Sequence, residues 1–301
     1  MIVKQKKKII ITGAKGQLGA SLCRFRWPES YSIYPLDHSQ LDITDMDAIE
    51  KVLSVLKPDC IVNTAVYGMG EGADTEKSFQ TNSLALLSLA SFCKKNQIPL
   101  IHFSTDYVFD GQQKSPYREQ DSKNPLNVYG SSKYAGELIV QHIAPLHIIL
   151  RTSWLYGSLG KNFMRWVWES SHMEKELTII NDQIGCPTNV LDVAEATVKM
   201  VCQQLEKPLA EGWGLYHLCG QTPTSWYEFA VFILDEISKY RSVKLKISPI
   251  TTKEYRDKFP KIIWRPLYSV LNCDRIQEQY SIPQKCWKEG VKQILKDWET
   301  F

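Results

Sequence analysis

Several kinds of feature are missing from this chain, and each absence excludes a class of protein. No run of 18 apolar residues occurs, so no membrane span is expected. The N-terminal lysines lead directly into a short apolar segment without the hydrophobic region of a signal peptide, which makes the cytoplasm the expected location. The net charge is only +3 and no nucleic-acid-binding motif is found, so no nucleic-acid partner is expected.

The cysteines also lack a pattern. There are eight of them, all spread singly, so neither a CxxC metal site nor a redox motif is predicted. Several lie in apolar runs, as Cys60 does, which is typical of free buried thiols in a reducing compartment. No internal repeat or low-complexity segment is found.

What the chain does have is an alternation of short apolar runs and amphipathic stretches. Strands are predicted at 8–12, 31–36, 60–65, 98–104 and 147–152, with helices at 17–25, 45–56, 75–96 and 128–142. This order favours an α/β protein with a doubly wound parallel sheet. A helix at 191–205 and a strand at 215–219 are expected to extend it, giving one domain from 1–152 plus 189–219. The aromatic-rich remainder, 153–188 plus 220–301, is expected to form a smaller lobe.

A glycine-rich turn follows the first predicted strand. Gly13 permits a tight bend, Gly16 lets the backbone approach a pyrophosphate, and Gly19 lets the next helix pack closely on the sheet. N–H groups at the start of that helix favour an anion. The strand before the turn and the helix after it predict a dinucleotide site. The contacts expected from this segment are Gly13, Lys15, Gly16, Gln17, Leu18 and Gly19.

The residues after the second strand leave the choice of dinucleotide open. Asp37 lies 18 residues after Gly19, where an acid would bind the adenosine ribose and favour NAD(H). Lys15 could instead pair with a 2′-phosphate and favour NADP(H), which is slightly preferred here. His38 and Ser39 do not decide between them. Asp42 and Ile43 could line the adenine, although a simple turn explains Asp42 equally well.

Tyr129 and Lys133 lie four residues apart on a predicted helix and so share one face. An ammonium group beside a phenol favours the phenolate and makes the phenol more acidic. Such a pair could pass a proton to a carbonyl oxygen while a hydride reaches its carbon. The spacing alone is weak evidence, because Tyr240 and Lys244 repeat it without a glycine turn or hydroxyl cluster upstream.

Other polar or aromatic groups follow the predicted strands, whose carboxyl ends meet at one edge of the sheet. Thr105 could bind a substrate carbonyl oxygen, or could belong to an ordinary strand-end turn. Trp154 could form a wall for a sugar or base, or could be a core residue. The loop that contains Gln183 could reach a ligand or cross between lobes. Arg265 could meet a diphosphate or lie at the surface.

Several longer phrases carry a specific resemblance. They are GAKGQLG at 13–19, STDYVFDG at 104–111, PLNVYGSSKYAGE at 125–137, RTSWLYG at 151–157, NDQIGCPT at 181–188, and Arg265-Pro266 with Ser269 and Leu271. By these phrases the chain resembles the dTDP-4-dehydrorhamnose reductases of the extended short-chain dehydrogenase/reductase superfamily. The resemblance implies a Rossmann-type sheet with a smaller C-terminal substrate-binding lobe.

The resemblance also implies a reaction, the NAD(P)H-dependent reduction of the C4 ketone of a dTDP- or UDP-linked 4-keto-6-deoxy sugar. Tyr129 would be the proton donor, Lys133 would tune the phenol, and Thr105 would orient the carbonyl. The substrate contacts that it implies are Thr105, Asp106, Tyr107, Trp154, Gln183 and Arg265. The loop with Ala65, Val66 and Tyr67 should lie near the nicotinamide. A pathway epimerase is a possible partner.

Two departures from the family pattern qualify this reading. Residues 65–72 read AVYGMGEG where the family usually has a sequence close to AAYT followed by an acid-rich stretch, so the substrate could differ. Ser21 and Lys288 stand where some members have glutamates that bind magnesium at a dimer interface. We therefore expect no metal, and a monomer or weak dimer.

Two other readings compete with the reductase. The regulatory β subunit of methionine adenosyltransferase resembles these reductases and shares YVFDG, so a non-catalytic NADP-binding regulator is the main alternative. A related epimerase or dehydratase would need an acid and base pair beside the tyrosine, of which Thr105 and Asp106 are a weak version. Turnover and product analysis would separate the three.

Overall fold

The computed structural model describes residues 5–68 and 74–300. At its centre is a six-stranded sheet in the order β10-β5-β4-β3-β1-β2, and all its neighbours pair in parallel. The strands are β1 (Lys7–Thr12), β2 (Tyr31–Leu36), β3 (Cys60–Asn63), β4 (Leu100–Thr105), β5 (His147–Thr152) and β10 (Gly214–His217). The strand order reverses between β1 and β3, which is where doubly wound sheets bind their ligands.

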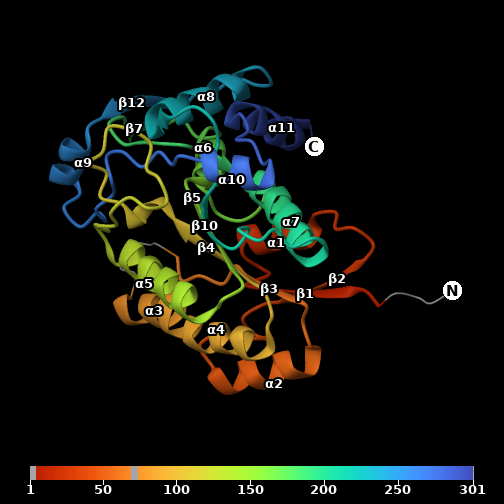
Figure 1. Ribbon diagram of the computed structural model, residues 1–301. Helices are drawn as coiled ribbons and strands as arrows, with labels where there is room; N and C mark the ends of the chain where they lie inside the picture. The colour runs from red at the N-terminus through yellow and green to blue at the C-terminus, as the bar shows by residue number, and fades with distance from the viewer. Residues whose placement is uncertain (1–4, 69–73, 301) are drawn as a thin grey trace.

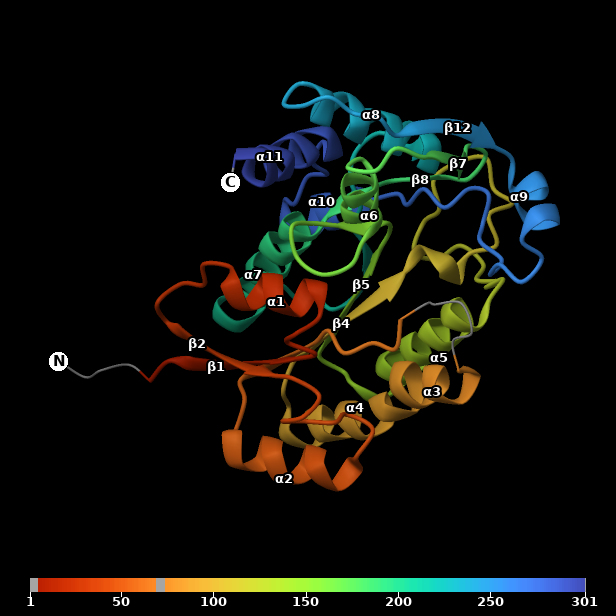
Figure 2. The ribbon, with the colours of Figure 1, turned by 180° about the vertical axis from the view of Figure 1, so that it is seen from behind.

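Helices cover both faces of this sheet. Figure 1 shows α1 (Gln17–Arg24) and α7 (Val190–Glu206) on one face, with α2 (Met46–Leu56), α4 (Ala85–Asn96) and α5 (Val128–Ile143) on the other, and Figure 2 shows the same layers from behind. The single helix predicted at 75–96 is interrupted. It consists of α3 (Thr75–Phe79), a π-helical turn η1 (Gln80–Leu84) and α4.

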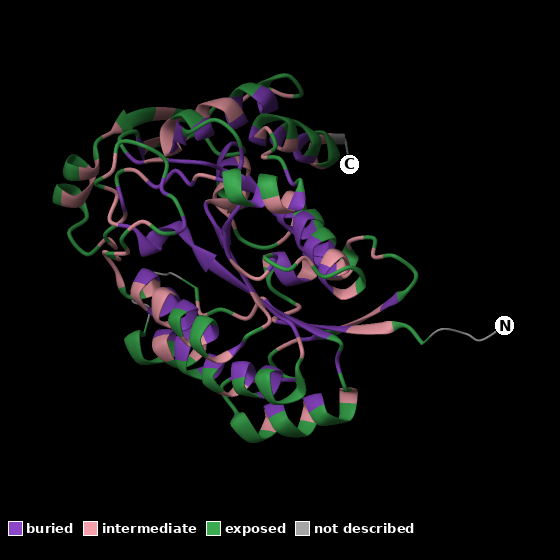
Figure 3. Cartoon of the chain, in the orientation of Figure 1, coloured by how far each residue is buried: buried purple, intermediate pink, exposed green. Residues whose placement is uncertain are grey.

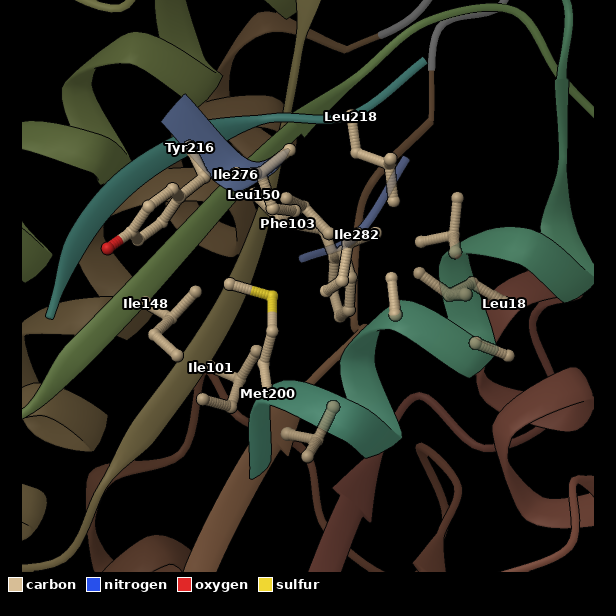
Figure 4. Close-up of a cluster of buried hydrophobic side chains, with 14 of the residues drawn as sticks. Leu18, Ile101, Phe103, Ile148, Leu150, Met200, Tyr216, Leu218, Ile276 and Ile282 are labelled. Carbon is tan, nitrogen blue, oxygen red and sulfur yellow. The ribbon is translucent and has the colours of Figure 1, made fainter. Parts of the chain in front are cut away.

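Side-chain alternation along the strands divides the core into two layers. Ile9 and Ile11 of β1 pack into the cluster beneath α1 and α7, whereas Ile10 packs into the cluster beneath α2 and α4. Apart from the edge strand β2, the strands of this sheet are largely buried, as Figure 3 shows. Figure 4 shows the first cluster, where Met200 of α7 lies among Ile101, Ile148 and other strand side chains. Burial on both faces explains why these strands read as continuous apolar runs.

Apart from α10, the remaining elements lie beyond the carboxyl edge of the sheet. The full set is η2 (Asp106–Val108), β6 (Leu155–Tyr156), α6 (Phe163–Ser170), β7 (Glu176–Ile180), β8 (Ile184–Gly185), β9 (Thr188–Asn189), β11 (Thr224–Ser225), α8 (Trp226–Ser238), β12 (Lys246–Ile250), α9 (Thr252–Lys258), α10 (Asp274–Tyr280) and α11 (Trp287–Thr300). A third cluster, with Met164, Phe229 and Val291, joins α6, α8 and α11. In contrast, Ile276 and Tyr280 of α10 pack into the first cluster of the sheet domain.

Two further findings concern the described residues, 5–68 and 74–300. None of their helices is long and apolar enough to cross a membrane. All eight cysteines fall in this part of the chain and are free thiols, as predicted.

Candidate functional site

The glycine turn between β1 and α1 lies against the end of β3. Gly13 has φ +67°, and a Cβ placed there would lie 2.6 Å from the Ala65 nitrogen. A Cβ on Gly19 would collide with the Gly13 carbonyl and lie 2.7 Å from Thr64 Oγ1. Only glycine fits at these positions, because backbone approaches backbone so closely. No side chain caps α1 at Gly16, so its first N–H groups are free to meet an anion.

Two cavities flank this turn. The first, about 510 Å³, is lined by Gly13, Lys15, Gly16, Asp37, His38, Ser39, Leu41, Asp42, Ile43, Thr64, Ala65, Val66 and Thr81. All the cofactor residues predicted after the second strand, which are Asp37, His38, Ser39, Asp42 and Ile43, therefore line this cavity. It meets a second cavity of similar volume along Gly16, Thr64, Ala65 and Val66, which line both. The two form one elongated cleft that suits a ligand of two linked halves.

Lys15 and Asp37, which left the choice between NAD(H) and NADP(H) open in the sequence, contact each other in the first cavity. Lys15 Nζ lies 2.5 Å from Asp37 Oδ2, and Asp37 Oδ1 accepts hydrogen bonds from the Ser39 N–H at 2.9 Å and hydroxyl at 2.6 Å. The Lys15 ammonium and these Ser39 bonds hold the pKa of Asp37 below its usual value. Asp42 also fulfils the turn role considered for it, since its Oδ1 accepts from the Thr44 N–H and hydroxyl.

The second cavity contains the predicted catalytic residues. Thr105 ends β4, while Tyr129 and Lys133 lie on the first turns of α5, and all three line the cavity with Gln17, Leu18, Asp106, Tyr107 and Trp154. Helix α5 starts where it does because Asn127 Oδ1 accepts the Gly130 N–H at 2.8 Å. A Cβ on Gly130 would strike the Tyr107 carbonyl, so glycine lets this helix approach η2 closely.

Burial controls the acidity of the tyrosine and the lysine. Burial raises the pKa of Tyr129 to about 12, with a further rise from the Asp106 charge and a reduction from a hydrogen bond with Thr105. Burial lowers the pKa of Lys133 to about 8, against the opposing charge of Glu137. The expected acidification of the phenol by Lys133 is therefore not found. The Lys133 Nζ instead lies 3.2 Å from His102 Nε2. The phenol keeps its proton at neutral pH, as a proton donor must.

Asp106 is a buried carboxyl group next to this pair. Its Oδ1 accepts a hydrogen bond from Thr105 Oγ1 at 3.1 Å, and the residue is only 2% exposed. Burial raises its pKa to about 7, although hydrogen bonds from Ser269 and Thr105 act in the opposite direction. Asp106 therefore titrates near neutrality within reach of the residue expected to orient the substrate.

Trp154 is held in an unusual conformation at the mouth of the cavity. Its backbone has φ +46°, and its indole ring stacks on Trp226 with centroids 3.5 Å apart and planes within 7°. A Cβ on Gly185 would lie 2.5 Å from the Trp154 ring, so Gly185 leaves room for it. Sequence reasoning missed Trp226 and Phe163 as lining residues. Trp226 follows Ser225, whose side chain caps α8, and Phe163 follows Asn162, whose side chain caps α6. These helix-start residues were the sequence signal available at the two positions.

Two predicted substrate contacts lie beyond the catalytic cavity. Arg265 lines two further cavities, one of which shares Phe163 and Trp226 with the catalytic cavity. Gln183 is buried, and its Nε2 donates to Thr252 Oγ1 at 3.1 Å. It does not line the catalytic cavity, so its contact with substrate stays a prediction.

The loop that departs from the family pattern is only partly described. Ala65 and Val66 line both halves of the cleft. Tyr67 is fixed by Asn82 of the π-helical turn, whose side chain accepts the Tyr67 N–H at 2.9 Å and donates to its carbonyl at 3.0 Å. The rest of the unusual segment, 69–73, lies outside the described residues.

Comparison with known proteins identifies the family. The family model for the RmlD substrate binding domain matches residues 7–300. The chain belongs to the dTDP-4-dehydrorhamnose reductase family. It is 35% identical over 293 residues to a dTDP-4-dehydrorhamnose reductase of Aggregatibacter actinomycetemcomitans, covering 95% of this chain and 98% of the relative.

Solved structures of the dTDP-4-dehydrorhamnose reductase family have the same fold. One from Clostridium acetobutylicum has a TM-score of 0.87 and 31% identity, covering 97% of this chain and 99% of that one. One from Bacillus anthracis, in complex with NADP, has a TM-score of 0.86 and 32% identity, covering 97% and 100%. The predicted family, Rossmann-type fold and class of NAD(P)-dependent oxidoreductase are thereby confirmed. The roles of individual residues stay predictions.

Proposed function

We propose that this protein reduces the C4 ketone of a nucleotide-linked 4-keto-6-deoxy sugar, with dTDP-4-dehydrorhamnose as the first candidate and a UDP-linked equivalent as the second. One observation carries the proposal. Thr105, Tyr129 and Lys133, from β4 and α5, line a single cavity that continues into the cleft beside the glycine turn. The names of the relatives support the same substrate.

The cleft fits a nicotinamide dinucleotide, which would supply the hydride. The close approach at Gly13 and Gly19 and the buried Gln17 Nε2, which has no hydrogen-bond partner among the described residues, suit a backbone-bound diphosphate. We propose a slight preference for NADP(H). Lys15 and His38 expose more than four-fifths of their side chains at the ribose end, while Asp37 is already engaged by Lys15 and Ser39. No metal takes part in this proposal.

Within the catalytic cavity each residue has a distinct task. Thr105 orients the substrate carbonyl by offering its hydroxyl, which in the described structure is bonded to Asp106. Tyr129 transfers its phenolic proton to the oxyanion that forms at C4. Lys133 lies one helical turn further along the same cavity and holds the ribose side of the cofactor.

The sugar and nucleotide would occupy the side of the cleft opposite the glycine turn. We propose that residues 153–188 plus 220–301 form the substrate-binding lobe, with the Trp154 and Trp226 stack as the wall against the sugar. Arg265 lies further along, beside a cavity that Lys253 and Arg256 also line. Three cationic side chains could pair with a diphosphate, although Asp110, Asp182 and Asp257 line the same cavity.

The test is a screen of purified protein against dTDP- and UDP-linked 4-keto-6-deoxy sugars with NADPH and NADH, with and without an added 4-keto-sugar epimerase. We expect steady cofactor oxidation and a product reduced at C4. Cofactor binding without turnover would support the regulatory alternative, and a product with an unreduced ketone would point to an epimerase or dehydratase. Light scattering in the same buffers would show whether the protein is a monomer or a weak dimer.

A further inference from the structure

A chain of buried hydrogen bonds runs from β1 to the lysine of the catalytic cavity. Thr12 Oγ1 donates to Asn63 Oδ1 at 2.6 Å, and the Ala65 N–H donates to the same oxygen at 3.2 Å. Asn63 Nδ2 lies 3.1 Å from His102 Nδ1, and His102 Nε2 lies 3.2 Å from Lys133 Nζ. Thr12, Asn63, His102 and Lys133 are each at most 3% exposed, so their polar atoms depend on these hydrogen-bond partners.

Asn63 determines which group donates and which accepts in each of these hydrogen bonds. A backbone N–H can only donate, so the Asn63 side-chain atom facing Ala65 must be the oxygen. The amide NH₂ of Asn63 then faces His102 Nδ1, which must accept and carries no proton. A neutral imidazole with an unprotonated Nδ1 has its proton on Nε2. That N–H is directed at the Lys133 nitrogen.

An amine can accept this hydrogen bond, but an ammonium group has no lone pair. We propose that His102 is a positioning residue, locked by Asn63 in the Nε2–H tautomer, and that its N–H favours the uncharged amine form of Lys133 in the free protein. The inference deepens the proposed function, because it concerns the lysine of the same cavity. Sequence analysis did not single out His102, which lies in an apolar strand.

The surroundings of Lys133 support the same direction. His102 faces it from β4, Asp106 lies on η2, and Tyr129 and Glu137 lie one turn away on α5. The Glu137 carboxylate is bonded to Arg151 of β5, at 2.8 and 2.5 Å, which limits its attraction for the lysine. From η1, Asn82 offers a neutral amide to Ser132. The ionisable residues at 76, 77, 94 and 95 on α3 and α4 are exposed, and Cys93 is buried against the sheet.

This arrangement has a consequence for the catalytic cycle. Each reduction leaves Tyr129 as a phenolate, which must regain a proton. Lys133 supplies it only from its ammonium form, which at a pKa of about 8 is a stronger acid than a free lysine and is still present at neutral pH, whereas the phenol has a pKa of about 12. The proton leaves Nζ for the phenolate oxygen, and the resulting amine regains a proton from water. His102 stabilises the amine in this exchange.

The other histidines provide an internal contrast. Nδ1 of buried His217 lies 3.1 Å from the Tyr117 carbonyl and 3.2 Å from the Asn272 carbonyl, while its Nε2 faces the Arg151 guanidinium. Its proton must therefore be on Nδ1, the opposite tautomer from His102. Burial keeps the pKa of both His102 and His217 well below the usual value, so both stay neutral.

The direct test is ¹⁵N NMR of histidine-labelled wild-type protein without cofactor. His102 and His217 should not titrate around neutral pH, and these two should show opposite tautomers. Assignment uses His102→Gln, and the contrast with His217 can be read even if that variant does not fold. An Nδ1–H tautomer at both buried histidines would overturn the proposal. This measurement needs no turnover, so it can succeed where the proposed reductase activity fails.

Two variants test the effect on Lys133. His102→Gln can turn its side-chain oxygen to the ammonium group, and Asn63→Asp gives His102 Nδ1 an acceptor, which moves the proton to Nδ1 and leaves Nε2 free to accept from Lys133. Both should raise the lysine pKa by on the order of one unit. The ¹³C titration of the Lys133 side chain and the alkaline limb of kcat/KM should both move to higher pH. Glutamine carries no charge. If the Lys133 pKa rises in both variants, the cause is therefore the reversed direction of the hydrogen bond and not the added charge of the aspartate. An unmoved titration in folded variants would refute the coupling.

Discussion

Replacing Tyr129 with phenylalanine should abolish proton donation while leaving the cleft intact. Tyr129 is half-buried and its phenol accounts for one hydrogen bond with Thr105, so its removal should cost stability only about 0.5–1.5 kcal/mol. Loss of a general acid typically lowers turnover about 10²–10⁴-fold, which is about 2.7–5.4 kcal/mol of transition-state stabilisation. The catalytic loss should therefore exceed the loss of stability by a clear margin.

The assay compares kcat with the dissociation constant for NADPH and the melting temperature of the same preparation. The matched control is Tyr240→Phe, because Tyr240 repeats the Tyr-x-x-x-Lys spacing but is 48% exposed and outside the cavity. We expect tight cofactor binding in both variants and lost turnover only at position 129. Undiminished kcat in Tyr129→Phe would show that another group donates the proton.

Three further changes test the cofactor cleft and the buried acid. Lys15→Ala should lower the ratio of kcat/KM for NADPH to that for NADH, on the order of tenfold, because a charged phosphate partner is lost; an unchanged ratio would place the 2′-phosphate elsewhere. Gly19→Ala should weaken cofactor binding and lower the melting temperature, whereas Gly68→Ala, whose added Cβ would meet no atom of the described residues within 4 Å, should do neither. Asp106 stays protonated to about pH 7 in the folded state but ionises near 4 when unfolded, so stability is lost as pH rises between these values. Asp106→Asn should therefore gain stability over wild type from pH 4 to 7 in melting experiments, and a constant difference would contradict the assigned pKa.

Sequence patterns predicted best those elements whose burial follows directly from the local order of apolar, polar and glycine residues. Strand β1 and the glycine turn were visible because apolar runs, β-branched residues and glycine spacing act within about 20 residues. The convergence of Thr105 and Trp154 followed from the rule that the carboxyl ends of parallel strands share one edge. These predictions needed only local pattern and topology.

The features that sequence reasoning missed depend on contacts between distant segments. The π-helical turn at 80–84 has no distinct composition, and it brings Asn82 to Tyr67 and Ser132. His102 lies in an apolar strand, where it reads as one polar residue among core positions. The stack of Trp154 on Trp226 joins residues 72 positions apart, and no periodicity predicts it. Pairings of this kind become visible only once the chain is folded.

Helix α5 shows why the acidity of the tyrosine differed from expectation. Tyr129, Lys133 and Glu137 are spaced by four and share a face, which in an exposed helix would place each charge beside the next. In the structure Lys133 and Glu137 are buried and Tyr129 is half-buried, and each member of the row has a partner from another element. Tyr129 contacts Thr105, Lys133 meets His102, and Glu137 pairs with Arg151, so the row is divided between β4 and β5. In a buried row the partners across the interface, and the loss of water, control protonation more than the neighbour along the helix does.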